Sequence, residues 1–396
     1  MPDTPLGGRI VRVVLADGDG AVGELIPLEV QTPWWPDVLP IVGAYPGLAV
    51  LRLLEATPAT PDANVGGEVT YLAEWLPRDL APARAVDPPI LPWHGVLHDD
   101  ALRLPWARPG GPVEDLRWAS GHVERSGPPV QYRTWNLSAI WTIPTPQGEV
   151  WLKTVPPFLQ HEPAILELLA GGPVPRLIAA SGHRQLLEAL PGEDGYHATL
   201  EEYRVLIDEL VALECSTIGA EHELLALGVP DRRWEALLAA ATAVVERHLP
   251  EHRELRRLLD EAAGRVAAIE ACGLPNVLVH GDAHSGNARI GPGAGRGIWF
   301  DWGDARVGHP LLDLGVLERP GVQRREALTS HWLDAWKAAV PRSDPHRAWP
   351  LVRPLAALGD AVVYQGFLDA IEATERIYHQ DDVMPCLLRA ARLAAE

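Results

Sequence analysis

Several features that mark other protein classes are scarce in this chain of 396 residues. Its three cysteines are widely spaced and form no C-x-x-C pair, which argues against a disulfide framework or a cysteine zinc site and favours a reducing compartment. No apolar run approaches the roughly 18–20 residues of a membrane span, and the first residues lack the pattern of a signal peptide. We therefore expect a cytoplasmic protein without membrane contact. The net charge of −19 argues against nucleic acid as a partner, because phosphate backbones require a basic face.

Lysine is also scarce, since only Lys153 and Lys337 are lysines among the 34 basic residues. Arginine and lysine differ most where a compact point charge on phosphate is needed, so a retained lysine can mark such a site. Lys153 lies in the alternating segment V-W-L-K-T-V, which predicts a strand, and we expect it to be functional. Lys337 lies in D-A-W-K-A-A-V, which is typical of an exposed helix.

Hydrophobic periodicity predicts three units, with boundaries at 1–113, 114–192 and 193–396. The predicted strands cover 8–31 (two strands joined by the turn D-G-D-G-A), 48–54, 69–76, 130–135, 138–143, 150–155, 175–180 and 184–190. The predicted helices cover 34–44, 162–170, 200–227, 233–247, 251–271, 324–340 and 349–378. The Pro-rich tract 77–113 is expected to be an irregular connector. This order predicts an α+β chain with a bilobal, kinase-like fold, in which a β-rich N-lobe and a helical C-lobe follow a small α+β N-terminal unit.

The most informative motif is H-G-D-A-H-S-G-N at 280–287, followed by F-D-W at 300–302. Both halves end short apolar segments that are typical of buried strands, so we expect their polar side chains to converge. Phosphoryl transfer needs such a set: Asp282 would accept the proton of an acceptor hydroxyl, while Asn287 and Asp301 would hold Mg²⁺ on the phosphates. Each residue alone could be a turn or cap residue. The three together favour phosphoryl transfer.

Other residues are expected to support this set. Lys153 would contact the α- and β-phosphates and Glu162 would fix it through an ion pair. His280 is predicted to orient the catalytic loop, His284 to make a structural hydrogen bond, and Asp313 to stabilise the loop. An H-x-D-x-H zinc site is conceivable, but no further ligand set is evident.

The segment 188–192 follows the last predicted strand of the small lobe and would be the hinge. Its residues Glu188, Ala189 and Leu190 would present backbone groups to the base of the nucleotide.

These segments together resemble the aminoglycoside phosphotransferase family, which is related to choline kinases and distantly to protein kinases. The motifs that carry the resemblance are H-G-D-A-H-S-G-N, F-D-W-G-D-A, G-H-P-L-L-D-L and V-W-L-K-T-V-P-P-F-L-Q-H-E, and it extends from about residue 130 to the C-terminus. It implies a kinase-like fold, Mg²⁺-dependent transfer of the γ-phosphate of ATP or GTP, and a small-molecule hydroxyl as acceptor. It places Asp282 as the base, Asn287 and Asp301 on magnesium, and Lys153 with Glu162 on the phosphates.

The chain departs from the kinase pattern in places. The loop T-W-N-L-S-A at 134–139 contains no glycine, so phosphate contacts would come from Ser138 and backbone N–H groups. The spacing of nine residues between Lys153 and Glu162 is short for the ion pair. The first 110 residues lie outside the resemblance, and their strand–turn–strand opening is faintly similar to Nudix hydrolases but lacks the glutamate-rich metal box. A cap that packs on the small lobe or helps to close the active site is therefore expected there.

The acceptor is the least defined part of the prediction. An antibiotic is the first candidate, and a sugar or amino sugar of primary metabolism is the alternative. Acidic residues of the helical region could hold a cationic acceptor or could be solvated surface charges; they are Asp194, Glu201, Glu202, Glu372, Glu375, Asp381 and Asp382. A non-catalytic kinase-like regulator and a metal-dependent hydrolase remain as alternatives from other classes.

Overall fold

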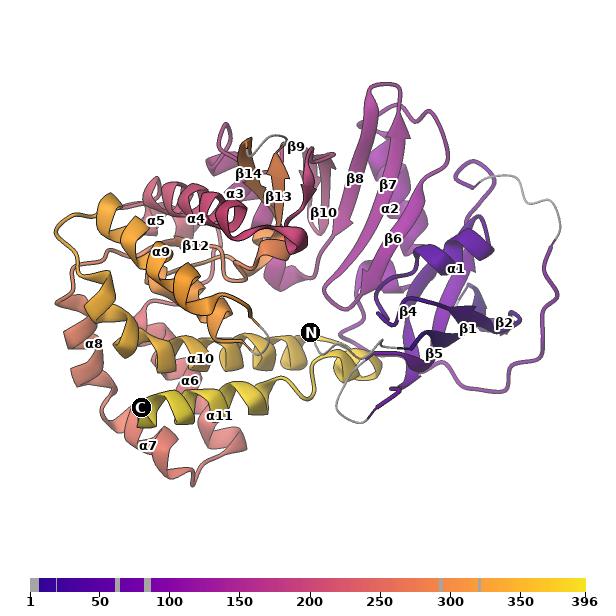
Figure 1. The fold of residues 1–396 in the computed structure, drawn as a ribbon. Helices are drawn as coiled ribbons and strands as arrows, with labels where there is room; N and C mark the ends of the chain where they lie inside the picture. Colours follow the sequence, from indigo (N-terminus) through magenta and orange to yellow (C-terminus); the bar gives the residue numbers. More distant parts are fainter. Residues whose placement is uncertain (1–6, 19, 61–64, 82–86, 292–294, 320–321) are drawn as a thin grey trace.

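The computed structural model describes residues 7–18, 20–60, 65–81, 87–291, 295–319 and 322–396. Two five-stranded sheets precede a mainly helical part, so the predicted α+β class with a β-rich first part and a helical second part is confirmed (Figure 1). In the described part of the chain, no helix combines the length and the apolar character that a membrane span requires.

The N-terminal sheet has the strand order β2-β1-β5-β4, with β3 also paired to β1. Its elements are β1 (Arg9–Asp17), β2 (Gly20–Glu24), β3 (Leu28–Val30), α1 (Leu39–Ala44), β4 (Leu48–Thr57) and β5 (Gly67–Trp75). The predicted turn between the first strands includes residue 19, which lies outside the described residues. The helix predicted over 34–44 begins only at Leu39, because Trp35 is buried with its indole N–H on the carbonyl of Gly66 (2.8 Å).

The second sheet has the order β6-β7-β8-β10-β9 and is antiparallel throughout. Its elements are β6 (Val130–Trp135), β7 (Ser138–Thr145), β8 (Gly148–Thr154), α3 (Glu162–Leu168), β9 (Leu177–Ser181) and β10 (Arg184–Glu188). Gln131 on β6 ties this sheet to the first, since its amide bonds the backbone N–H and C=O of Val50 at 2.7 and 2.8 Å.

One helix of this region, α2 (Gly111–Ser120), contradicts the prediction of an irregular connector up to residue 113. Proline and glycine at 110–112 suggested a break, yet proline in the first turn of a helix has no hydrogen bond to lose. Leu116 and Ala119 are fully buried against the second sheet, and this burial stabilises the helix.

Among the described residues, the helical part contains five short strands, of which β11 (Glu193–Asp194) comes first. Its elements are α4 (Leu200–Cys215), α5 (Glu221–Ala226), α6 (Trp234–His248), α7 (Arg253–Asp260), α8 (Ala262–Glu270), β12 (Val277–Val279), β13 (Ala288–Gly291), β14 (Gly295–Trp299), β15 (Arg306–Gly308), the 3₁₀ segment η6 (Pro310–Glu318), α9 (Arg325–Ala339), α10 (Pro345–Ala370), the 3₁₀ segment η7 (Ala373–Tyr378) and α11 (Val383–Ala395).

Three of the predicted helices here were wrong in extent. The helix predicted over 200–227 is broken near Gly219, whose φ of 85° ends α4 and its following turns. The helix predicted over 251–271 is two helices, α7 and α8. The helix predicted over 349–378 ends at Ala370, and α11 was not predicted.

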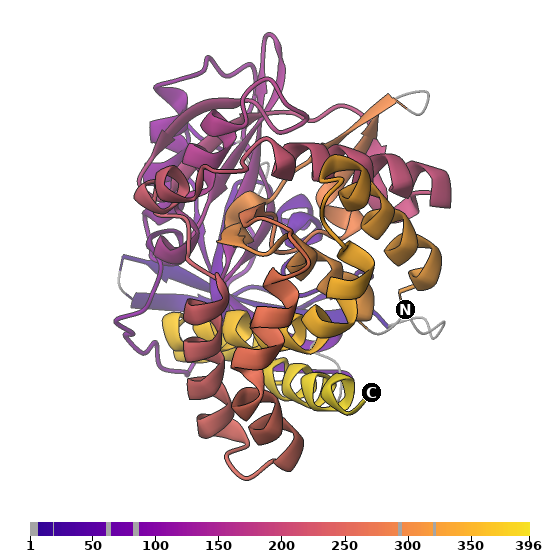
Figure 2. The ribbon, with the colours of Figure 1, turned by 90° about the vertical axis from the view of Figure 1, so that its left-hand side faces the viewer.

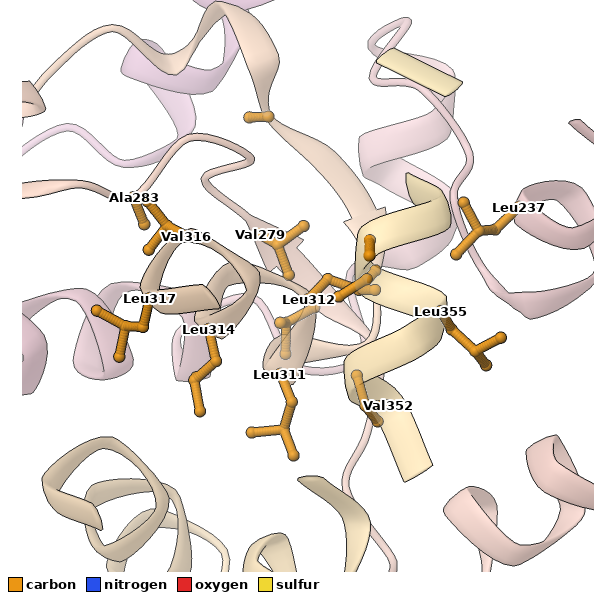
Figure 3. Close-up of a cluster of buried hydrophobic side chains, with 14 of the residues drawn as sticks. Leu237, Val279, Ala283, Leu311, Leu312, Leu314, Val316, Leu317, Val352 and Leu355 are labelled. Atoms are coloured by element: carbon orange, nitrogen blue, oxygen red, sulfur yellow. The ribbon is translucent and has the colours of Figure 1, made fainter. Parts of the chain in front are cut away.

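A single large core lies beneath the motif strands. Val279 at the end of β12 and Ala283 in the following loop are buried, and leucines of η6 and α10 fill the space around them (Figure 3). Leu312 and Leu355 are among the side chains in this cluster. The motif loop at 280–287 therefore rests on packed apolar side chains, which limit its movement.

The chain end closes back onto the N-terminal unit. In Figures 1 and 2 the segment after α10 reaches the first sheet, and Tyr378 of η7 belongs to the core of that sheet. The ring of Tyr378 meets Trp35 and Trp135 edge-on, with centroids 5.9 and 5.8 Å apart. Glu375 accepts the backbone N–H of Leu53 at 3.1 Å. Residues more than 300 positions apart thus form one core.

Candidate active site

Lys153 lies at the centre of an ion-pair network between the two lobes. Its ammonium is 2.7 Å from Glu162 Oε2 on α3 and 2.5 Å from Asp301 Oδ1, just after β14. Burial alone would lower the pKa of Lys153, but the carboxylates of Asp301 and Glu162 outweigh burial and raise it. Lys153 therefore stays charged, as a phosphate ligand must.

Glu162 is held by more than the lysine. Gln185 on β10 donates to Glu162 Oε2 at 2.5 Å, and the backbone N–H of Trp302 donates to Oε1 at 3.0 Å. The spacing of nine residues between Lys153 and Glu162 is sufficient for the ion pair. Lys153 lies one residue before the end of β8, and Glu162 is the first residue of α3. Gln185 lies in none of the motifs, and Trp302, although it belongs to F-D-W, acts through its backbone amide, so the sequence revealed neither contact.

Asp282 is surrounded by hydrogen-bond donors, most of them from the loop 280–287. Asn287 Nδ2 bonds the backbone oxygen of Asp282 at 2.9 Å and its Oδ2 at 3.0 Å. His284 Nδ1 accepts the N–H of Gly286 at 3.0 Å, so its protonated Nε2 faces Asp282 Oδ2 at 3.3 Å. Arg319 donates from Nη1 to Asp282 Oδ1 at 2.6 Å. Arg319 belongs to none of the sequence motifs.

These donors decide the charge of Asp282. Burial by itself would raise its pKa, but Arg319 and His284 outweigh burial, so the pKa of Asp282 lies well below the usual range. Asp304, three residues after Asp301, shows the opposite case. Burial and the charges of Asp282 and Asp301 raise the pKa of Asp304 to about 7. The sequence motifs by themselves predict no role for Asp304.

His280 and Gly281 fix the course of the loop. His280 is fully buried; its Nε2 donates to the carbonyl of Phe300 at 3.0 Å and its Nδ1 accepts the N–H of Asp282 at 3.4 Å. Gly281 has φ 89°, and a Cβ there would lie 2.0 Å from the carbonyl oxygen of Asp304. The glycine of H-G-D is thus required for close approach of the two motif segments.

Asp313 organises the loop backbone, because its carboxylate accepts the N–H groups of His280 (2.7 Å) and Gly281 (2.8 Å). Beneath it Glu214 on α4 is 1% exposed, and its carboxyl shares a hydrogen bond with Asp313. Neither Glu214 oxygen meets an N–H or hydroxyl donor within the described ranges. Two ionised carboxylates cannot share a hydrogen bond, and burial together with Asp313 raises the pKa of Glu214 well above its usual range. Glu214 is therefore protonated and neutral, and it donates the hydrogen bond to the carboxylate of Asp313.

Glu214→Gln is expected to stabilise the protein increasingly as pH rises. Glutamine keeps a donor for Asp313 and cannot ionise. A carboxyl whose pKa is raised by folding contributes its full stabilisation at pH values below its unfolded pKa of 4.5. That contribution is lost as the pH rises toward the pKa of the folded state. The variant should gain up to about 1.4 kcal/mol of unfolding free energy per pH unit in that window. Denaturant unfolding between about pH 5 and pH 7 measures this gain. The exposed Glu246→Gln control should show none, and parallel curves for wild type and Glu214→Gln would contradict the assignment.

Asp301 and Asn287 present oxygen ligands. Asp301 has φ 64°, a left-handed conformation that is unfavourable for a residue with a side chain, and its carboxylate is half exposed. Asn287 uses its Nδ2 for Asp282, which leaves its amide oxygen as an acceptor. One carboxylate and one amide oxygen suit Mg²⁺, which takes its further ligands from phosphates and water. Over the described ranges no three His, Cys, Asp or Glu side chains group to hold a metal by themselves.

Two further predicted contacts with the nucleotide concern the hinge at 188–190 and the loop at 134–139. Glu188 ends β10 and pairs with Arg176, while the backbones of Ala189 and Leu190 make no hydrogen bond within the described chain. These two residues can therefore receive a nucleotide base. Ser138 is 6% exposed, and its Oγ accepts the indole N–H of Trp135 at 3.1 Å, which leaves its own O–H to donate to a phosphate oxygen.

The seven acidic residues considered as acceptor ligands are not brought together. Glu372 binds Arg103 at 3.0 Å and Glu375 lies under the N-terminal sheet. The remaining five have local surroundings: Asp194 accepts the N–H of Tyr196 (2.9 Å), Glu201 pairs with Arg204 (2.6 Å), Glu202 closes a capping box with Thr199, Asp381 is exposed and Asp382 lies 3.2 Å from His379.

Comparisons with known proteins agree with this geometry. The model of the phosphotransferase enzyme family, APH, matches residues 133–355. No curated protein matches the chain in sequence. Among solved structures, ethanolamine kinase from Plasmodium vivax is 9% identical with a TM-score of 0.51, covering 68% of this chain and 82% of that one. Macrolide 2'-phosphotransferase MphH from Brachybacterium faecium is 19% identical with a TM-score of 0.50, covering 70% of this chain and 97% of that one.

These structural likenesses show the kinase-like fold that the sequence predicted. The family match extends over more than half of the 396 residues and includes the motif residues from Lys153 to Asp313. The chain therefore belongs to the phosphotransferase enzyme family, whose members act on hydroxyl-bearing small molecules.

Proposed function

We propose that this protein transfers the γ-phosphoryl group of ATP or GTP to a hydroxyl of a small molecule, with Mg²⁺ bound by Asn287 and Asp301. The observation that carries the proposal is that the expected groups form two bonded sets, which the backbone hydrogen bond from the N–H of Phe300 to the carbonyl of Asn287 (3.0 Å) brings together. Asp282 and Asn287 are joined by a hydrogen bond, and Asp301, Lys153 and Glu162 by ion pairs. Each residue also has the charge that its role requires.

Asp282 would act as the base. Its carboxylate is ionised because its pKa is lowered, and it accepts the proton of the acceptor hydroxyl while the oxygen attacks the γ-phosphorus. The new O–P bond forms as the bond between the γ-phosphorus and its bridging oxygen breaks, and the electron pair leaves with the nucleoside diphosphate. His284 and Asn287 hold the carboxylate in place for this step.

Lys153 would bind the phosphates of the donor. Asp301 Oδ1 and Glu162 Oε2 accept two of the three ammonium hydrogens, at 2.5 and 2.7 Å, and the third can meet a phosphate oxygen. Bound Mg²⁺ supplies positive charge that offsets the charge of the phosphates. Glu162 keeps the ammonium at this position, because Gln185 and the Trp302 amide fix the glutamate from two other sides.

A screen of hydroxyl compounds with ATP and with GTP tests the proposal. The panel contains antibiotics, sugars, amino sugars and nucleosides, because both an antibiotic and a metabolic sugar are proposed acceptors. We expect one class to gain the mass of one phosphoryl group with stoichiometric release of nucleoside diphosphate. Loss of the product when Mg²⁺ is chelated would support the metal role. Release of inorganic phosphate alone, with no acceptor ever modified, would contradict the proposal.

A further inference from the structure

Arg319 is placed at the reacting carboxylate without belonging to any of the motifs. It follows the last residue of η6, and its backbone carbonyl is held by Arg325 Nη2 at 3.1 Å. Its Nη1 reaches Asp282 Oδ1 at 2.6 Å, and the two side chains are 28% and 27% exposed. The pair is therefore accessible from the open site.

The hydrogen bond from Arg319 occupies Asp282 Oδ1, the oxygen that would accept the proton of the acceptor hydroxyl. Asp282 Oδ2 already accepts from Asn287 (3.0 Å) and faces His284 (3.3 Å). Oδ1 is the oxygen left for the acceptor hydroxyl, and Arg319 covers it. An incoming acceptor must therefore share Oδ1 with the guanidinium or draw the guanidinium toward itself.

Arg319 has charged and polar neighbours on the helical part besides Asp282. They include Asp360 and Tyr364 on α10 and Tyr203 on α4. We therefore expect the group that Arg319 binds to come from the acceptor, which the helical part would hold, and not from the nucleotide.

The surroundings leave Arg319 with unused binding capacity. Asp360 is bonded to Arg389 of α11, so Asp282 is the one carboxylate that takes a hydrogen bond from Arg319 within the described residues. The guanidinium has five N–H donors in a planar fork, which matches a carboxylate or phosphate. No buried nitrogen of Arg319 lacks a partner, so its remaining donors are open to solvent or to a ligand.

We propose that Arg319 binds an anionic group, a carboxylate or a phosphate, that the acceptor carries close to its reacting hydroxyl. The inference rests on the proposed function, because it concerns the acceptor of that same site. In the free protein the carboxylate of Asp282 takes the place of the acceptor's anion. Binding of the anion moves the guanidinium from Asp282 Oδ1 and exposes that oxygen to the hydroxyl. Binding of the correct acceptor and release of Asp282 Oδ1 from Arg319 then occur in the same step.

Four compounds with the same three-carbon hydroxyl frame test this proposal: glycerate, glycerol 3-phosphate, glycerol and 3-amino-1,2-propanediol. Their dissociation constants are obtained from the shift of the melting temperature with ligand concentration. Charge-assisted hydrogen bonds predict that at least one of the two anions binds wild type about tenfold or more tightly than glycerol, and that the amine does not bind better than glycerol. The stronger of the two anions identifies carboxylate or phosphate as the recognised group.

Variants separate this role from a structural one. Arg319→Met should bind all four compounds equally, and Arg319→Lys should retain part of the preference because it keeps the charge without the fork. Arg247→Met removes an exposed arginine that pairs with Asp369 at the surface and should keep the full preference. Circular dichroism confirms that each variant is folded. Equal affinities for the four compounds in wild type, or an unchanged anion preference in Arg319→Met, would overturn the proposal.

The binding measurement does not depend on phosphoryl transfer. If an arginine-dependent anion preference is found but no acceptor is ever phosphorylated, the proposed function fails and the anion site stands. If phosphoryl transfer occurs but anions are not preferred, only the role of Arg319 fails.

Discussion

Replacing Asp282 by asparagine is expected to lower kcat by about 100- to 10,000-fold, because the variant cannot accept the proton of the acceptor hydroxyl. Asparagine has nearly the same shape, and its amide oxygen can still receive the hydrogen bond of Arg319. Nucleotide affinity should therefore stay within about twofold of wild type, since Asp282 makes no ion pair with Lys153 and general-base catalysis acts on the chemical step. Initial rates at saturating nucleotide, together with nucleotide titration of tryptophan fluorescence, measure both quantities.

A matched control for this variant is Asp208→Asn. Asp208 is 56% exposed on α4 and pairs with His331 at 2.9 Å, so the same change of one carboxylate is made at the surface. Its kcat should equal that of wild type. Unchanged turnover in Asp282→Asn would remove Asp282 from the role of base.

Lys153→Met is expected to lower kcat/KM by about 100- to 1,000-fold, because one preorganised positive donor to the phosphates is lost. Unlike the change at Asp282, this change should also weaken nucleotide binding. Glu162 keeps two donors, Gln185 and the Trp302 amide, and so the small lobe should still fold. The melting temperature should fall, because the buried carboxylate of Glu162 loses its ion partner.

The second lysine of the chain supplies the control. Lys337 on α9 donates to the carbonyls of Pro341 (2.9 Å) and Ser343 (2.7 Å), far in sequence from every motif. Lys337→Met makes the same chemical change and should leave kcat/KM unaltered. Equal activity of the two methionine variants would show that the scarcity of lysine carries no functional information.

Local patterns in the sequence were sufficient for much of the site. The strand of Lys153 is defined by alternating apolar residues, and the motif strands before Asp282 and Asp301 by short apolar runs. The spacing of residues within one loop also fixes the contact of Asp282 with Asn287. These features depend on neighbours within a few residues, which periodicity and turn chemistry describe well.

Contacts across long sequence separations were not predictable. Arg319 and Asp282 are 37 positions apart, and an arginine after a 3₁₀ segment has no pattern that distinguishes it from a surface residue. Glu214 looked like an ordinary helix residue, although it is buried against Asp313. The acidic residues Glu372 and Glu375 suggested a cation site, but tertiary packing places them under the N-terminal sheet.

The N-terminal unit shows the same limit. Its strands were predicted from alternation, but their attachment to the chain end was not. Tyr378 enters the core of the first sheet, and Trp135 of the loop 134–139 packs on both Tyr378 and His379. The first sheet therefore supports the loop that would cover the nucleotide, although no motif joins the two regions.

The fate of a label on the γ-phosphoryl group tests the central claim most directly. Wild type and Asp282→Asn are each incubated with γ-labelled ATP or GTP, Mg²⁺ and the panel of hydroxyl compounds, and the label is followed by mass. Phosphoryl transfer through Asp282 predicts that the label moves to an acceptor in wild type and stays on the nucleotide in the variant. Label that appears only in inorganic phosphate, at the same rate in both proteins, would contradict it.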